Sequence, residues 1–210
     1  MNRTTTAHHR RSDTGPLPGP SHATTAATAA GAVGGLALFA DLGLHAFGPL
    51  GRSYSVVATV MALCLLGVPA AFWLRGAVGR GWRRGLAVTG TALIVLGVAA
   101  WVTAFVILFA DPGAAFTQRL TPAGSALMAL GMLLLGTAVL ASRRLSRPRA
   151  VAPLVVGLYF PAQLAVQLAF FLGGRDGDPG PNGLLLGAWG LLWAWAALAA
   201  GTARTGPGRP

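Results

Sequence analysis

Six long apolar runs separated by short polar stretches are the feature that most constrains this chain. The runs cover about residues 26–47, 53–74, 85–110, 122–141, 151–172 and 183–201. A helix of about 20 apolar residues crosses a hydrocarbon core about 30 Å thick. The sequence therefore predicts an all-α membrane protein, a six-helix transmembrane bundle that occupies residues 26–201.

Composition excludes an ordinary soluble domain. Only 10% of the 210 residues are charged and the mean hydropathy is +0.62, whereas about 25% of residues are charged in soluble proteins. The pI of about 11.9 would suggest nucleic acid as a partner. Because the basic residues lie between apolar runs, we expect them to meet anionic lipid headgroups, and we expect no nucleic-acid partner.

The distribution of arginine predicts the orientation. Thirteen of the sixteen Arg residues lie in the two termini and in the loops after the second and fourth runs. The other three are Arg52, Arg119 and Arg175, in the remaining loops. Because loops rich in basic residues stay in the cytoplasm, both termini are predicted to be cytoplasmic. Residues 1–25 are expected to form a disordered cytoplasmic tail and residues 202–210 a second cytoplasmic tail.

The chain contains no Lys and no Glu. Together with its many Ala, Gly and Arg residues, this usage is typical of GC-rich coding sequences, and we expect an actinobacterial plasma membrane. The missing residue types exclude a lysine Schiff base, a P-loop lysine and an HExxH zinc site.

Small residues recur at spacings that favour close helix contacts. The pairs are Gly31 with Gly35, Gly90 with Gly97, Gly124 with Gly131, and Gly183 with Gly187. In lipid, such residues let helix backbones approach each other, so we interpret them as packing within the bundle. Pro69 and Pro161 fall inside apolar runs and are predicted to kink them.

Four polar side chains are the candidates for a ligand-binding or proton-binding site. Asp41 and His45 lie four residues apart in the first run, and Gln163 and Gln167 lie four residues apart in the fifth. Residues four apart share a helix face. Asp41, His45 and Gln167 are predicted in the outer half of the membrane and Gln163 near its middle, so the two pairs are expected at similar depth. One hypothesis is an outward-facing polar cavity lined by all four. The alternative is that they bind each other and hold helices together.

Other chemistry has weaker support. Trp189, Trp193 and Trp195 could stack on a flat ligand, or they could face lipid or neighbouring helices. Asp176 and Asp178 alternate as in a calcium loop, but no terminal Glu completes one. We therefore expect no catalytic residue, no metal site and no cofactor.

The sequence favours a non-enzymatic integral membrane protein, either an accessory, regulatory or structural subunit. The expected partners are membrane lipids, and a membrane-protein partner or a second copy of the chain. The alternative is a small transporter or proton-coupled carrier that uses Asp41.

Overall fold

The computed structural model describes residues 21–45, 53–111, 114–172 and 179–202. These residues form seven helices, and no strand occurs among them. The helices are α1 (His22–His45), α2 (Ser53–Leu65), α3 (Gly67–Leu74), α4 (Trp82–Ala110), α5 (Thr117–Ser142), α6 (Arg147–Leu172) and α7 (Pro179–Gly201). The prediction of an all-helical chain is confirmed for the described residues.

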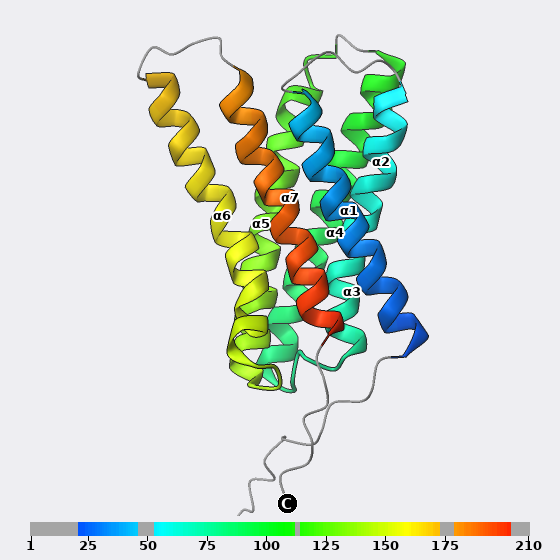
Figure 1. The fold of residues 1–210 in the computed structure, drawn as a ribbon, viewed down its shortest axis with the longest axis vertical. Helices are drawn as coiled ribbons and strands as arrows, with labels where there is room; N and C mark the ends of the chain where they lie inside the picture. Colours follow the sequence, from blue (N-terminus) through cyan, green and yellow to red (C-terminus); the bar gives the residue numbers. More distant parts are fainter. Residues whose placement is uncertain (1–20, 46–52, 112–113, 173–178, 203–210) are drawn as a thin grey trace, which may run out of the picture.

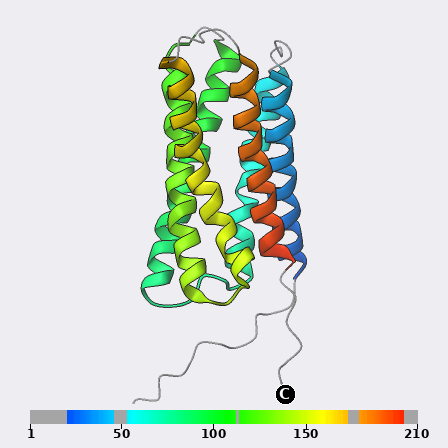
Figure 2. The same cartoon turned by 60° about the vertical axis from the view of Figure 1, so that its left-hand side comes forward.

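The helices run side by side and form a closed ring (Figures 1 and 2). Around the ring, α1 packs against α2, α2 against α4, α4 against α5, α5 against α6, α6 against α7, and α7 against α1. The short helix α3 continues α2 and packs against α1 and α7. Each long helix therefore packs against its two neighbours in the ring, α1 and α7 also pack against α3, and large apolar side chains remain exposed on the outside.

Five segments are long and apolar enough to cross a membrane. They are His22–Ala40, Val56–Leu74, Trp82–Ala110, Arg119–Ser142 and Arg147–Ala169. In α7 the apolar stretch among the described residues is the shorter segment Gly187–Gly201. The outer faces of the helices carry large apolar side chains that are exposed, for example Leu36, Val60, Leu96, Leu168 and Leu198. A continuous apolar surface of this kind is expected in a lipid environment.

The amino end of α1 lies four residues earlier than the predicted span. Ser21 explains this start, because its Oγ accepts a hydrogen bond from the Thr24 backbone N–H at 3.2 Å and lies 2.9 Å from the Thr24 hydroxyl. A serine in this position satisfies a helix N–H group that would otherwise lack a partner. Part of the predicted tail is thus helical.

The second predicted span is interrupted between α2 and α3, near Pro69. Leu66 lies in a turn between the two helices, and Pro69 has no N–H to donate to the carbonyl four residues earlier. Gly67 lies against the α1 backbone, where an added Cβ would collide with the Ala27 carbonyl. The kink predicted at Pro69 corresponds to this interruption, and the helix that follows it, α3, packs against α1 and α7. Pro161 lies within α6, which is continuous from Arg147 to Leu172, and the kink predicted there stays a prediction.

Glycines bring α4 and α5 into backbone contact. Gly90 lies opposite Gly131, and Gly97 lies opposite Gly124; a Cβ added to Gly90 or Gly97 would be 2.6 or 2.5 Å from the facing carbonyl oxygen. The two residues of each helix are seven apart, so both contacts fall on one helix face. Gly31 and Gly35 likewise contact α3 and α7. The predicted use of these glycines for packing within the bundle is confirmed.

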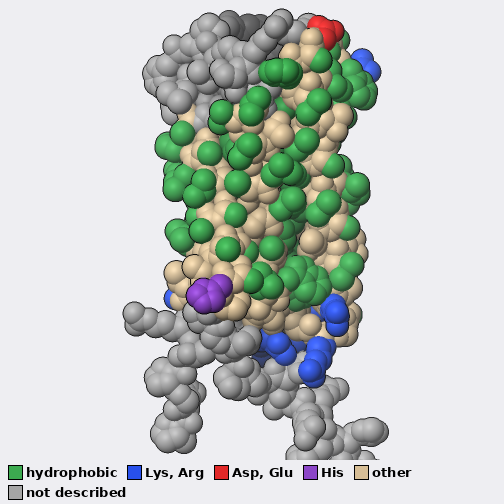
Figure 3. Space-filling model, turned by 90° about the vertical axis from the view of Figure 1, so that its right-hand side faces the viewer, with side chains coloured by type: hydrophobic (Ala, Val, Ile, Leu, Met, Phe, Trp, Pro, Cys, Tyr) green, Lys and Arg blue, Asp and Glu red, His purple; other side chains and the backbone are tan. Residues whose placement is uncertain are grey.

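Arginine side chains gather at one end of the bundle (blue, bottom of Figure 3). At this end Arg144 donates to the Gly76 carbonyl at 2.8 Å, and the Ser142 hydroxyl donates to the Ala77 carbonyl at 2.6 Å. These bonds fix the connection between α3 and α4 against the carboxyl end of α5. Gly76 and Gly79 have φ values of 62° and 78°, which glycine adopts without a steric penalty.

Candidate functional site

The predicted acid and base lie in the last turns of α1. The helix extends to His45, so the backbone of Asp41 and that of His45 are one helical turn apart as expected. Their side chains lie outside the described residues, as do all atoms of 46–52. The predicted contact between these side chains and the glutamines stays a prediction.

Gln163 is the candidate residue that the structure describes in detail. It is only 2% exposed, and its Oε1 atom is buried without a hydrogen-bond partner among the described residues. An unsatisfied buried amide oxygen costs about 1–3 kcal/mol, so this position calls for a partner. Gln167, one turn further along α6, is partly exposed.

The depth of Gln163 follows from its neighbours on the same face of α6. One turn below it, the Tyr159 hydroxyl donates to the Leu185 carbonyl of α7 at 2.8 Å. Gly187 of α7 in turn lies beside Phe39 of α1. Tyr159 is therefore near the level of Phe39 and Asp41, and Gln163 is about 6 Å further from the Arg-rich end of the bundle at 1.5 Å per residue. Gln163 thus lies at a depth similar to that of Asp41, and a contact between the two side chains stays a prediction.

A cluster of aromatic rings packs in the interior between α4, α6 and α7. The Trp189 ring lies 6.1 Å from that of Trp101, 5.3 Å from that of Phe160 and 5.9 Å from that of Trp193, measured between centroids. Trp189 and Trp193 are fully buried, and Trp101 is 5% exposed. We call these four residues, together with Phe105, which packs edge-on to Trp101 at 5.9 Å, the aromatic plug.

The plug connects four helices. Trp101 and Phe105 belong to α4, Phe160 to α6, and Trp189 and Trp193 to α7, while hydrogen bonds tie it to α5. The Trp101 Nε1–H lies 2.9 Å from the Thr121 carbonyl and 3.2 Å from the Ser125 hydroxyl. The Trp189 Nε1–H donates to the Val156 carbonyl at 3.0 Å. Trp193 Nε1 is buried without a partner among the described residues.

The tryptophans of the last helix therefore divide into two sets. Trp189 and Trp193 point into the bundle, whereas Trp195 is 39% exposed on its outer side. A four-residue spacing places the first two on one face, and Trp195, two residues after Trp193, falls on another. That spacing is the sequence signal that separates them. The packing of Trp189 with Trp101 of α4 depends on the ring of helices and has no local signal.

Sequence reasoning missed a stripe of hydroxyl side chains on α5. Thr117, Thr121 and Ser125 recur every four residues, and Thr117 and Ser125 are buried. Each hydroxyl donates to a carbonyl in or next to its own helix, at 2.7, 3.2 and 3.0 Å. The spacing was the available signal. Because each hydroxyl already donates its proton in or next to α5, these side chains can only accept hydrogen bonds from other groups in the interior.

A buried cation was also missed. Arg75 follows α3 and is 1% exposed, and its guanidinium donates to the carbonyls of Ala200 and Gly201 at 3.2 and 3.0 Å. A cation is favourable at the carboxyl end of a helix, where unpaired carbonyls accumulate negative charge. Burial, and secondly the positive charge of Arg149, lowers the pKa of Arg75 from its ordinary value. Arg75 thus links the carboxyl end of α3 to the carboxyl end of α7 by hydrogen bonds.

The part of the chain that the structure describes contains no cluster of three or more His, Cys, Asp or Glu side chains that could hold a metal ion. Cys64 is a partly buried free thiol in α2. Asp176 and Asp178 lie outside the described residues.

Comparisons with known proteins add no family to this description. No protein-family model matches the chain, and neither a curated protein nor a solved structure matches it.

Proposed function

We propose that this chain is a six-span protein of a bacterial plasma membrane, with both termini in the cytoplasm. Five segments have the length and hydropathy of a span, and α7 would be the sixth. The Arg-rich end of the bundle supports the orientation, because basic loops stay on the cytoplasmic side. Asp111 and Arg119, which flank the α4–α5 connection, would then lie outside.

Within this membrane we propose a non-enzymatic role as an accessory or regulatory subunit. The aromatic plug is the observation that carries this proposal. Five large rings contact one another across α4, α6 and α7, in three edge-to-face pairs and one tilted pair, and fill the space between these helices. A protein that moves a solute needs a path past its midplane, whereas a protein that acts by binding a partner does not.

Purification from native membranes tests this role. The tagged chain would be extracted in a mild detergent and its complex weighed by native mass spectrometry. The proposal predicts a stoichiometric membrane-protein partner, or a multiple of the 21.3 kDa chain mass. A monomer that alone carries protons or solute into liposomes would contradict it.

A proton-coupled carrier that uses Asp41 is the second candidate, and Gln163 favours it. An amide oxygen that is buried without a partner among the described residues, at a depth similar to that of Asp41, is what an outward-facing ligand site would contain. The test is proton flux into liposomes that enclose a pH-sensitive dye. A carrier predicts flux from the wild type that Asp41→Asn and Gln163→Leu each reduce, with Ala165→Leu, at an exposed position of the same helix, as the matched comparison. Absence of flux from the wild type would reject the carrier.

A further inference from the structure

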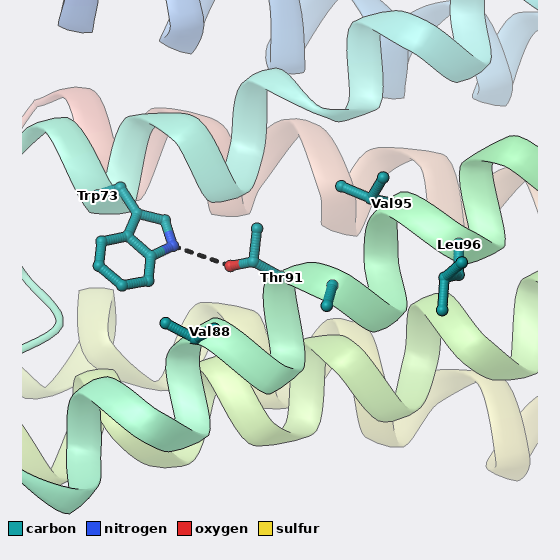
Figure 4. Close-up of a pocket in the computed structure, with 6 residues that line it drawn as sticks. Trp73, Val88, Thr91, Val95 and Leu96 are labelled. Atoms are coloured by element: carbon teal, nitrogen blue, oxygen red, sulfur yellow. Dashed lines mark hydrogen bonds between the residues drawn. The ribbon is translucent and has the colours of Figure 1, made fainter.

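A lipid-facing groove lies between α3 and α4, on the half of the bundle near the Arg-rich end. It has a volume of about 500 Å³ and is lined by Trp73, Val88, Thr91, Ala92, Val95 and Leu96. Figure 4 shows the α4 residues in a row along one helix face, with the Trp73 ring closing one end. This volume is within the range of about 300–1,000 Å³ typical of small-molecule sites.

The interruption of the second span explains why this groove exists. Helix α2 packs against α4, but after Leu66 the chain turns, and α3 packs against α1 and α7 instead. The Trp73 Nε1–H spans the resulting gap and donates to the Thr91 hydroxyl at 2.8 Å. Because that bond satisfies both polar groups, the groove offers an almost wholly apolar surface.

The groove also has a charged end. Arg84 precedes Val88 by one helical turn and is exposed on the same face of α4. Gly85, on this face too, has open space where a Cβ would project. From Arg84 to Leu96 the face is about 18 Å long at 1.5 Å per residue. Half of a hydrocarbon core is about 15 Å thick, so the groove has the depth of one leaflet with a cation at its headgroup end.

We propose that this groove binds an anionic glycerophospholipid of the Arg-rich leaflet. One acyl chain lies along Val88, Ala92 and Leu96, and the phosphate binds Arg84. A partner helix fits less well, because it would have to cross both leaflets, whereas α2 covers α4 beyond the interruption. The inference rests on the membrane-spanning arrangement proposed above and not on the accessory role.

Native mass spectrometry of the purified protein tests the site, with phosphatidylglycerol and phosphatidylcholine of identical acyl chains as probes. One basic side chain near an anionic headgroup accounts for about a fivefold change in affinity. Arg84→Gln should therefore reduce the preference for phosphatidylglycerol about fivefold. Ala92→Trp, which fills the groove, should abolish retention of the first bound lipid.

Two matched variants separate the site from general effects. Arg119→Gln removes an exposed charge at the opposite end of the bundle, and Ala165→Trp adds the same ring to an exposed position on α6. Both should bind lipid as the wild type does. The proposal is overturned if Arg84→Gln keeps the wild-type preference, or if Ala92→Trp and Ala165→Trp retain lipid equally. If the protein purifies as a monomer without a partner but still binds the lipid, the accessory role is rejected and the lipid site stands.

Discussion

The contact between α4 and α5 makes the sharpest stability prediction. An alanine Cβ at Gly97 would lie 2.5 Å from the Gly124 carbonyl oxygen and 2.6 Å from Met128 Cγ. Relieving the backbone contact to 3.0–3.4 Å requires the helices to separate locally by about 0.5–0.9 Å. Overpacking of this kind costs about 1–3 kcal/mol. Gly97→Ala is therefore expected to destabilise the bundle, although alanine favours a helix over glycine by about 1 kcal/mol.

A glycine in the same helix supplies the control. Gly85 also lies in α4, and a Cβ there meets nothing within 4 Å. Gly85→Ala gains the same helix preference without the collision, so the difference between the two variants isolates the contact. We expect Gly97→Ala to be less stable than Gly85→Ala by about 1–3 kcal/mol, measured as the free energy of unfolding by sodium dodecyl sulfate in mixed micelles. Equal stabilities, or a more stable Gly97→Ala protein, would refute the packing described for α4 and α5.

Three further predictions concern single side chains, measured by the same unfolding assay. Gln163→Leu should leave stability unchanged or raise it by about 1 kcal/mol, because it removes an amide oxygen that is buried without a partner among the described residues. A clear loss of stability would show that Gln163 holds helices together. Arg75→Met should lower the free energy of unfolding by about 1.5–3 kcal/mol, since the charged hydrogen bonds to Ala200 and Gly201 are lost. Arg84→Met, at an exposed position, should change stability little. A similar loss of stability in both variants would contradict the role of Arg75. Trp189→Ala should cost about 3–5 kcal/mol, whereas Trp195→Ala on the exposed side should cost much less; the reverse order would contradict the aromatic plug.

Features that repeat along one helix could be predicted from the sequence. Hydropathy and length indicated the helices, the seven-residue spacing of Gly90 with Gly97 and of Gly124 with Gly131 indicated a packing face, and Pro69 indicated the interruption of the second span. Each depends on local geometry, which the sequence encodes directly. The start of α1 at His22 lies before the predicted span, because Ser21 and most of the residues that follow it before that span are polar like the tail that precedes them.

Features that join distant segments could not be predicted in the same way. The burial of Arg75 depends on α3 turning towards the carboxyl end of α7, and in the sequence this residue resembles the other loop arginines. The meeting of Trp101 with Trp189 depends on the order of helices around the ring. Of the four residues proposed for the polar site, Gln163 is now placed in the interior, while its partnership with Asp41 and His45 stays a prediction.

Thiol labelling in intact cells tests the central claim, a six-span bundle with its Arg-rich end in the cytoplasm. In a Cys64→Ala background, single cysteines would replace Ala115, Ser146 and Thr202, which are all exposed at helix ends. A charged reagent that cannot cross the membrane should label Ala115→Cys alone, and the other two only after the cells are opened. Labelling of Ser146→Cys in intact cells would contradict the orientation. Labelling of Thr202→Cys without Ser146→Cys would show that α7 does not cross the membrane and that the chain has five spans.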